Sequence, residues 1–407
     1  MENKRTFKLA IVAPTCFYYQ TPLFRALAMN ERLNLTVYFC SDEGLSGKDV
    51  KSSYGSDEKW GGEGGLLDGY RSKFLKNYSP WGSYLKSLVG LANFGIWREL
   101  SREQPDAVIV MSWMNPTWWL VFLACVRFKI PVLFMTDANV SAERLKSKWK
   151  SWAKKILLGK FLFRLTSGFL YAGKANRQLY SYYGVPENKL VPFAYSWGYG
   201  AMVEQSKHLI GQKNELRKKY GLPHDSFIIL YCGRLSPEKG SQVLMEAYKM
   251  IDRPNKALVL VGDGRQKGHL KRLVERNGLD EVYFMGFKDR NEISNFYSLA
   301  DLLVLPSHRE TWGIVVNEAL CFSLPVIVSD QVGAGNEMVM HQENGLIFPA
   351  GDSKMLAGHI KAIMDLPEEA RQKMRDRSGE IIRQWAERDL GSPLIKYLDS
   401  ICDPLVN

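Results

Sequence analysis

The chain has 407 residues, of which 46% are apolar and 24% are charged, a composition that excludes a disordered or fibrous protein and leaves room for two or three compact domains. Its formal net charge is +11 and its isoelectric point is about 9.2. The excess lies in one half, because residues 1–200 carry 27 Lys and Arg against 15 Asp and Glu, whereas residues 201–407 carry 27 against 28. An anionic partner, such as nucleic acid, a membrane or an acidic acceptor, is therefore expected to meet the first half.

Histidine and cysteine narrow the chemistry further. All six histidines follow residue 200, which excludes a histidine base from the first half. The six cysteines form no C-x-x-C motif and no Cys/His cluster, so they indicate reduced core thiols of a cytoplasmic protein rather than disulfides or a zinc site. The apolar start of the chain is too short for a signal peptide. Residues 118–135 are interrupted by Arg127, Lys129 and Pro131, which indicates a helix and a strand rather than a membrane span.

Short apolar runs alternate with longer helical patterns, as in parallel sheets that are covered on both faces. The first series of predicted strands comprises residues 8–14, 35–40, 107–112, 131–136, 168–173 and 190–194, and residues 41–92 are expected to form loops. The second series comprises 227–233, 256–262, 281–286, 301–307, 324–330 and 344–350, and a helical tail over about 368–401 follows.

This double pattern predicts an α/β protein of two doubly wound, Rossmann-like domains that face each other across a cleft. The join near residues 195–215 separates a first domain, 1–197, from a second domain, 198–384. Residues 385–407 are expected to form a helix that crosses back to the first domain.

The sequence HRETWGIVVNEA, residues 308–319, lies between two predicted strands of the second domain. It places Glu310 and Glu318 eight residues apart, and Thr311-Trp312-Gly313 marks a turn into a helix. A loop carboxylate beside a helix N-terminus offers an acceptor for sugar hydroxyls next to backbone N–H groups that suit diphosphate oxygens. The alternative interpretation is that Glu310 is a surface loop residue and Glu318 a solvated helix residue.

A second group of charged residues follows the strand 227–233, in the sequence YCGRLSPEKG. Arg234 can bridge phosphate oxygens, Lys239 adds a point charge, and Gly233 lets the backbone approach closely. The alternative is that both cations are solvated surface residues. Turns follow three other strands of the series, and all five segments lie at carboxyl ends of strands, where open α/β sheets bind ligands. These turns are 262–264, 286–287 and 329–333.

The segments GRLSPEKG, VGDG, GF, ETWGIVVNEA, SDQVGA and NGLIFPAGD occur in an order that resembles the donor domain of family 4 retaining glycosyltransferases, which have the GT-B fold. The resemblance implies a domain that holds a UDP-, GDP- or similarly activated sugar. It implies that Arg234 and Lys239 hold the diphosphate, that Glu310 contacts the transferred sugar and that Glu318 contacts the ribose. The other implied donor contacts are Gly233, Gly262, Phe287 at the base, and the backbone of Trp312, Gly313 and Ile314.

The first half departs from the family pattern. Many relatives have a glycine-rich first βα loop and a histidine after the fourth strand, where this chain has residues 14–21 and 136–139. Asp137 is the candidate acceptor-side catalytic residue, although it equally fits an N-cap of a following helix. Aromatic loops can stack on sugar rings, with core or interface contacts as the alternative. The candidate acceptor contacts are Tyr18, Gln20, Trp113, Asn115 and Asp137.

The sequence has no D-x-D triplet, which favours a GT-B enzyme that uses no metal ion. The resemblance also implies transfer with retention, in which the departing phosphate takes the proton of the acceptor and no strong protein base is needed. We therefore expect no metal and no cofactor, with the nucleoside diphosphate sugar as co-substrate. The expected catalytic residues are Glu310, Lys239, Arg234 and Asp137.

Residues 144–164 contain eight Lys or Arg and no acidic residue, and apolar residues recur among them near helical spacing. A cationic amphipathic helix of this kind can lie on an anionic membrane, whereas an ordinary surface helix is the alternative. No zinc finger, RNA-recognition or helix-turn-helix pattern points to nucleic acid. The segment thus favours a cytoplasmic protein that is peripheral on the inner face of the cell membrane.

The expected function is transfer of a sugar to a hydroxyl of a glycan or lipid-linked acceptor in the synthesis of polysaccharide, lipopolysaccharide or glycolipid. Two alternatives remain open. A sugar-nucleotide 2-epimerase of the same fold would need acid and base groups, including histidine, from both domains. A catalytically silent partner of a glycosyltransferase complex would account for the altered loops of the first half.

Overall fold

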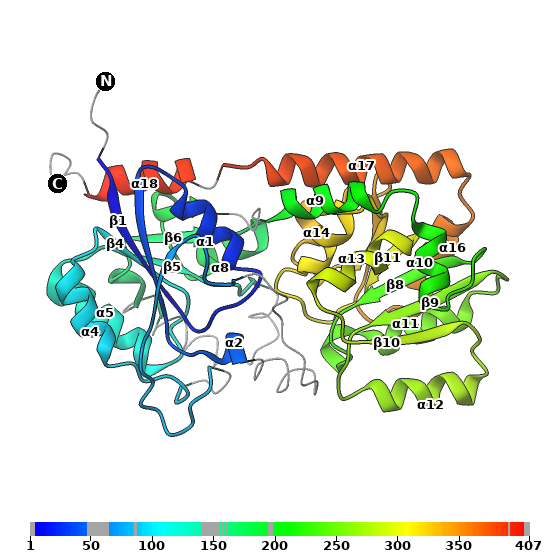
Figure 1. Cartoon of the computed structure of the whole chain (residues 1–407), viewed down its shortest axis with the longest axis horizontal. Coiled ribbons are helices and arrows are strands. Elements are labelled where there is room, and N and C mark those ends of the chain that lie inside the picture. The colour runs from blue at the N-terminus through cyan, green and yellow to red at the C-terminus, as the bar shows by residue number, and fades with distance from the viewer. Residues whose placement is uncertain are drawn as a thin grey trace. The chain divides into compact units, whose positions relative to one another are not determined.

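The computed structural model describes residues 5–46, 65–84, 88–140, 155, 158–159, 162–193, 198–389 and 391–402. These residues divide into two compact units (Figure 1). The first unit holds the described residues before 198 and after 387, and the second holds residues 198–387.

The described part of the first unit contains a parallel sheet in the order β3-β2-β1-β4-β5-β6-β7. The order reverses beside β1, so this strand pairs with both β2 and β4, with Phe7 opposite Leu33 and Leu9 opposite Ala107. The strands are β1 (Phe7–Ala13), β2 (Leu33–Phe39), β3 (Arg71–Phe74), β4 (Ala107–Val110), β5 (Val132–Met135), β6 (Gly168–Tyr171) and β7 (Leu190–Pro192).

Consecutive residues of β1, such as Leu9 and Ala10, are both buried, which shows that both faces of this sheet are covered. A core on one face combines Ala10 and Val12 with side chains of α4 (Gly95–Glu103), α5 (Pro116–Phe128) and α8 (Lys174–Tyr182). The helix α1 (Thr21–Ala28) packs against β2, and α18 (Gly391–Cys402), red in Figure 1, packs against β7. The expected helix and strand over residues 118–135 are confirmed as α5 and β5.

The second unit repeats the architecture with a parallel sheet in the order β10-β9-β8-β11-β12-β13. Its order reverses between β8 and β11 in the same way. The strands are β8 (Phe227–Cys232), β9 (Lys256–Val261), β10 (Val282–Gly286), β11 (Leu302–Leu305), β12 (Val326–Ser329) and β13 (Gly345–Phe348).

Two layers of helices enclose this second sheet. One core joins alternate residues of the strands to α11 (Ser241–Met250), α12 (Lys267–Asn277), α16 (Ser353–Met364) and α17 (Glu368–Ala386). The other layer is formed by α9 (Tyr199–His208), α13 (Arg290–Leu299) and α14 (Ile314–Cys321), which contact one another and the strands β8 and β11. Short helices α10 (Lys213–Lys219) and α15 (Gly335–Met338) complete this unit.

The predicted α/β class with two doubly wound parallel sheets is confirmed, and one local prediction is wrong. Residues 41–92 were expected to be loops, but they contain the edge strand β3 and the short helix α2 (Glu43–Ser46). The strand sequence RSKF is charged and half exposed, as is common at sheet edges, so it lacks the apolar run of a buried strand. The expected helical tail is divided into α17 and α18, because Asp389 accepts hydrogen bonds from Gly391 and Ser392 and starts a new helix.

All six cysteines lie in the described residues, five of them are buried, and none is in a disulfide. Burial raises the pKa of Cys40 and Cys125 far above the ordinary value of a thiol. These thiols are core residues, as the sequence predicts.

Candidate functional site

The charged loops of the second unit lie at the carboxyl edge of its sheet. Residues 233–240 follow β8 and residues 306–313 follow β11, the two strands between which the strand order reverses. Ligands of open α/β sheets bind outside the carboxyl ends of the strands at this reversal. The two segments with the strongest sequence signals thus meet at the position where the topology favours a ligand.

The two loops are bonded to each other through their backbones. The N–H groups of His308 and Arg309 donate to the carbonyl oxygen of Glu238 at 2.9 and 3.2 Å. Gly240 has φ +68°, and a Cβ atom there would lie 2.0 Å from the carbonyl oxygen of Pro306. Only glycine permits this approach, so the sequence SPEKG brings Lys239 to the end of β11.

Lys239 and Glu310 form an ion pair in which Nζ donates to the carboxylate oxygen Oε2. Their side chains are only 20% and 13% exposed. Lys239 ends a 3₁₀ turn, Pro237–Lys239, and backbone bonds to Gln331 and Gly333 hold Glu310 in place. The interpretation of these two residues as solvated surface groups is therefore wrong.

Arg234 lies beside a carboxylate that the sequence analysis did not single out. Its Nη2 atom is 3.7 Å from Oε1 of Glu238, and Nη2 of Arg265 is 3.5 Å from Oε2 of the same residue. Burial acts to raise the pKa of Glu238, but hydrogen bonding and the charges of Arg234 and Arg265 lower it below its usual value. An incoming anion would compete with Glu238 for these arginines; the only sequence signal was its spacing of four from Arg234.

The ends of β8, β9 and β10 approach each other through glycines. Gly262 has φ +136°, and a Cβ atom there would lie 2.0 Å from the carbonyl oxygen of Gly233. The N–H group of Gly262 donates to the carbonyl oxygen of Gly286 at 2.8 Å. Phe287 follows directly and is 8% exposed. The turns predicted after these strands therefore form one continuous edge with the loop of Arg234.

The helix α14 begins at Ile314, after Gly313 in the left-handed conformation with φ +94°. The side chain of Trp312 turns into the core, where Nε1 donates to Oδ1 of Asn317 at 2.9 Å and the ring lies 5.5 Å from that of Trp385. The backbone of residues 312–314 is thus the part of this turn that remains suited to a ligand, as the resemblance implies for these residues.

Glu318 lies in the second turn of α14 and is 6% exposed, so the interpretation as a solvated helix residue is wrong. The hydroxyl of Tyr297, on α13, donates to its Oε2 atom at 2.7 Å. Sequence reasoning missed Tyr297, because a tyrosine in an amphipathic helix is usually read as a core residue.

The aromatic loop after β1 forms a cluster within the first unit. The ring of Tyr18 lies 5.6 Å from that of Tyr19, which in turn stacks on Phe17 at 5.2 Å. The ring of Tyr84 contacts Phe17 edge-on at 5.2 Å. The cluster adjoins Glu43, a 9% exposed carboxylate of α2 that accepts bonds from the N–H group of Tyr84 and from a serine hydroxyl. No sequence signal marked Glu43, since it lies in the segment expected to be loops.

The other acceptor-side candidates lie at neighbouring strand ends of the first unit. Gln20 is 4% exposed, and its Oε1 atom has no hydrogen-bond partner among the described residues. Oδ1 of Asn115 accepts the N–H groups of Gly90 and Leu91 at 3.0 and 3.2 Å, so Asn115 holds this loop. Trp113 packs partly buried against the core after β4, and Asp137 is exposed after β5.

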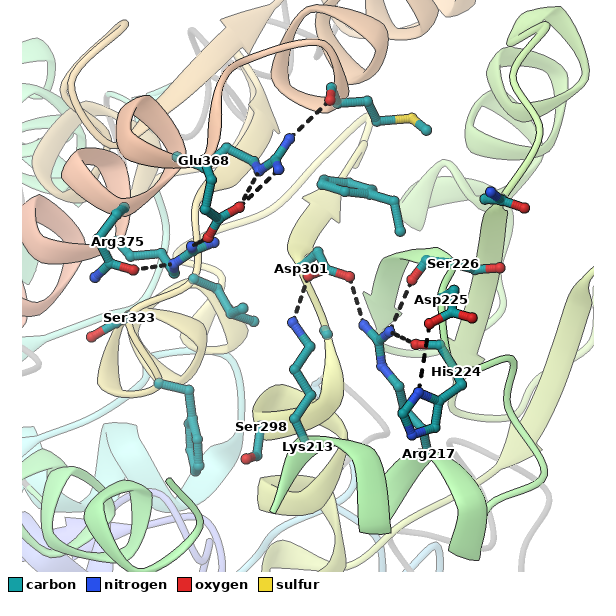
Figure 2. Close-up of a pocket in the computed structure, with 18 of the residues that line it drawn as sticks. Lys213, Arg217, His224, Asp225, Ser226, Ser298, Asp301, Ser323, Glu368 and Arg375 are labelled. Atoms are coloured by element: carbon teal, nitrogen blue, oxygen red, sulfur yellow. Dashed lines mark hydrogen bonds and ion pairs between the residues drawn. The ribbon is translucent and has the colours of Figure 1, made fainter. Parts of the chain in front are cut away.

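A cavity of roughly 880 Å³ lies at the opposite edge of the second sheet, beside the starts of its strands (Figure 2). Ion pairs line it: Lys213 and Arg217 both contact Asp301, at 2.5 and 2.7 Å, and Arg371 contacts Glu368 at 2.8 Å. These charged side chains are paired with one another, and the candidate donor residues lie at the other ends of the strands. The cavity is therefore separate from the candidate site.

Two further sequence predictions concern membranes and metals. Within the described ranges, no helix is long and apolar enough to cross a membrane. The basic segment 144–164 lies largely outside the residues that the structure describes. No three His, Cys, Asp or Glu side chains of the described residues gather as metal ligands would.

Residues 212–383 match the family model described as glycosyl transferases group 1. Among curated relatives, the chain is 32% identical over 173 residues to alpha-D-kanosaminyltransferase of Streptomyces kanamyceticus. The aligned residues make up 42% of this chain and 44% of the relative. The chain is 30% identical over 168 residues to alpha-monoglucosyldiacylglycerol synthase of Acholeplasma laidlawii, with 40% and 41% covered. The matched stretch thus spans about two fifths of the length of these relatives.

Solved structures resemble the chain over nearly its full length. HepE from Anabaena, in complex with UDP, has a TM-score of 0.73 at 17% identity and covers 97% of this chain and 100% of its own. WaaG, a glycosyltransferase involved in lipopolysaccharide biosynthesis, has a TM-score of 0.62 at 18% identity, with 96% and 98% covered. At these identities the likeness shows the fold, which is GT-B.

Proposed function

Because residues 212–383 match the family model described as glycosyl transferases group 1, we propose that the protein is a retaining glycosyltransferase. It moves a sugar from a UDP- or GDP-sugar to a hydroxyl of a glycan or lipid-linked acceptor. The observation that supports this proposal best is the ion pair of Lys239 and Glu310 at the reversal of the second sheet, with Arg234 on the same loop as Lys239. A protein of similar fold, HepE from Anabaena, has been solved in complex with UDP-glucose.

The ion pair suggests how the donor is received. A diphosphate competes with Glu310 for Lys239 and with Glu238 for Arg234, because a diphosphate carries more negative charge than a single carboxylate. Once Lys239 turns to the diphosphate, the carboxylate of Glu310 accepts hydroxyls of the transferred sugar. Backbone N–H groups at the start of α14 add partial positive charge beside the phosphates.

In the transfer step, the bond between the sugar and the diphosphate breaks while the acceptor oxygen bonds to the same face of the sugar. Negative charge develops on the diphosphate as its bond to the sugar breaks, and Lys239 and Arg234 stabilise this charge. The departing phosphate oxygen then takes the proton of the acceptor hydroxyl. We propose that these cations act without a metal ion and that no cofactor takes part.

On the acceptor side, Tyr18 and Trp113 offer aromatic faces. The carbonyl of Gln20, which has no hydrogen-bond partner within the described part of the chain, offers an acceptor for a hydroxyl. Asp137 is exposed after β5 and would orient the reacting hydroxyl. Asn115 contributes to acceptor binding indirectly, because its side chain holds the loop at Gly90 and Leu91 in place.

The test of this function is release of nucleotide from a panel of UDP-, GDP- and ADP-sugars, each with and without glycan and lipid-linked acceptors. A glycosyltransferase releases nucleoside diphosphate faster when the acceptor is present. A 2-epimerase would change the sugar of the donor at C2 without an acceptor, and a catalytically silent partner would turn over none of the panel. Either of these two results would refute the proposed transfer.

We further propose that residues 144–164 hold the protein on the inner face of the cell membrane, where lipid-linked acceptors lie. A basic residue near an anionic bilayer contributes about 1 kcal/mol of binding free energy, so eight of them provide a strong, salt-sensitive attraction. The protein is expected to sediment with phosphatidylserine vesicles at low salt and to be released at high salt. Absence of binding at low salt would contradict the proposal.

A further inference from the structure

Tyr297 connects two parts of the candidate donor site from behind. It lies on α13, is fully buried, and donates its hydroxyl hydrogen to Oε2 of Glu318 at 2.7 Å. Its ring stacks on Phe322, just beyond the end of α14, at 5.6 Å. Its hydroxyl also interacts with the thiol of Cys232, which precedes Gly233 at the end of β8. Tyr297 thus contacts both the strand that leads to the phosphate loop and the helix that carries Glu318.

The hydrogen bond has a fixed direction. Burial and the nearby thiol and carboxylate raise the pKa of Tyr297 well above its ordinary value, so the hydroxyl keeps its proton at neutral pH. A protonated phenol donates one hydrogen bond, and a carboxylate can only accept. Glu318 is therefore held by a donor that does not change its protonation state in the physiological range.

A carboxylate in this position is costly unless it is well bonded. Removing an ionised group from water costs several kcal/mol, and a hydrogen bond to the charged form offsets part of that cost. A bond to one carboxylate oxygen also fixes the rotation of the group about its last side-chain torsion, which is otherwise broad. The ring of Tyr297 cannot move in response, because it is enclosed by the core and stacked on Phe322.

We propose that Tyr297 is a positioning residue that aims the carboxylate of Glu318 at the ribose of the donor and thereby sets selectivity for ribonucleotides. This inference rests on the proposed function, in which Glu318 contacts the ribose. Tyr297 itself contacts no substrate. A pocket that is built to bond a hydroxyl rejects an analogue that lacks it, because its own polar group is then left unpaired.

The experiment compares binding of UDP with binding of 2′,3′-dideoxy-UDP by isothermal titration calorimetry, and repeats it with the guanosine pair. The full-length wild type is expected to prefer the ribonucleotide by about tenfold to a hundredfold, the effect of one charge-assisted hydrogen bond. In Tyr297→Phe the preference is expected to fall to about threefold or less, chiefly because the ribonucleotide binds more weakly.

The matched control is Tyr248→Phe, which removes one hydroxyl from another buried tyrosine of the same unit. Its hydroxyl bonds the backbone carbonyl of Lys256 at 3.2 Å and lies outside the candidate site. This variant is expected to keep the full preference for the ribonucleotide. If Tyr248→Phe loses the preference as far as Tyr297→Phe does, the effect is a general loss of structure and the inference is overturned.

A double-mutant comparison supplies a second test, and its first variant, Glu318→Gln, leaves Tyr297 in place. In Glu318→Gln the preference is expected to be lost, and adding Tyr297→Phe is expected to cause no further loss, because the tyrosine acts through Glu318. A further loss in the double variant overturns the inference.

Failure of the proposed function is recognised separately. A wild type that binds neither UDP nor GDP overturns both the function and the inference. A wild type that binds and discriminates, together with a Tyr297→Phe variant that discriminates equally well, overturns the inference alone.

Discussion

The chemistry of the candidate donor site depends on a few charged side chains that are already paired with side chains of opposite charge. Lys239 and Glu310 neutralise each other in a setting that is four-fifths buried or more. Breaking such a pair by removing one partner leaves an uncompensated charge, whereas keeping both lets the charges be redistributed onto a ligand. The two partners should therefore differ in what their removal does to binding and to turnover.

We predict that Glu310→Gln leaves UDP or GDP binding unchanged or tighter, because Lys239 is released to the diphosphate, while turnover falls about a hundredfold or more. Lys239→Met should weaken nucleotide binding about tenfold to a hundredfold through loss of a charge-assisted hydrogen bond. Calorimetry and initial rates separate the two effects.

The control for this pair is Arg253→Ala, which breaks the Arg253–Asp365 ion pair of the same unit at 2.8 Å, remote from the carboxyl edge of the sheet. This exposed pair is worth at most about 1 kcal/mol, so binding and turnover should stay as in the wild type. Equal losses of nucleotide binding in Glu310→Gln and Lys239→Met would contradict the proposed division of roles.

At the level of the elements, loops that leave neighbouring strands are held together by backbone contacts as well as by the Lys239–Glu310 ion pair. Gly262 and Gly240 stand where a Cβ atom would strike a carbonyl oxygen of the adjacent loop at 2.0 Å. A side chain at either position would force two strand ends apart. The spacing of Arg234, Lys239 and Glu310 therefore depends on glycines as well as on the charged residues themselves.

We predict that Gly262→Ala lowers the free energy of unfolding by more than about 2 kcal/mol and weakens nucleotide binding. Positive φ alone costs about 1–2 kcal/mol for a residue with a side chain, and the contact with Gly233 adds to it. Denaturant unfolding and calorimetry measure the two effects.

The matched control is Gly278→Ala, since Gly278 has φ +57° at the end of α12 but no atom within 4 Å of its added Cβ. It should lose about 1–2 kcal/mol of stability and bind nucleotide normally. If both variants lose the same stability and neither loses binding, the close contact at Gly262 has no role in the site.

In the molecule as a whole, the last residues of the chain belong to the first unit. After 190 residues of the second unit, from 198 to 387, the chain returns as α18. The hydroxyl of Tyr397 donates to the carbonyl oxygen of Ser167 at 2.5 Å, and Arg32 pairs with Asp399 at 2.7 Å. Leu394 and Leu398 are fully buried. The stability of the first unit therefore depends on the last helix of the chain.

We predict that Leu398→Ala destabilises the first unit by about 2–5 kcal/mol, the usual cost of a cavity in a core. Hydrogen exchange read by mass spectrometry should show faster exchange in β5 and β6 than in β8 and β11. Leu356→Ala, a fully buried residue of α16, should reverse this pattern. Equal changes in both units for both variants would contradict the assignment of α18 to the first unit.

Much of this architecture could be predicted from the sequence. The apolar runs from 227–233 to 344–350 coincide with β8 to β13, because buried parallel strands need aliphatic residues on both faces. The edge strand β3 escaped prediction, since an edge position tolerates the charged sequence RSKF. The division between α17 and α18 depends on the cap at Asp389, a local bond that competes with continued helix.

For the site, the residue types at each strand end follow from the amino-acid sequence, because chain order and strand order place Arg234, Lys239 and Glu310 at carboxyl edges. Which of these residues touch depends on the folded arrangement. Lys239 and Glu310 are 71 residues apart, and their contact depends on the parallel neighbours β8 and β11 and on a glycine that lets their loops meet. The same holds for Tyr297 and Glu318, since burial and a single bond between two helices are properties of the folded arrangement, which no local pattern encodes.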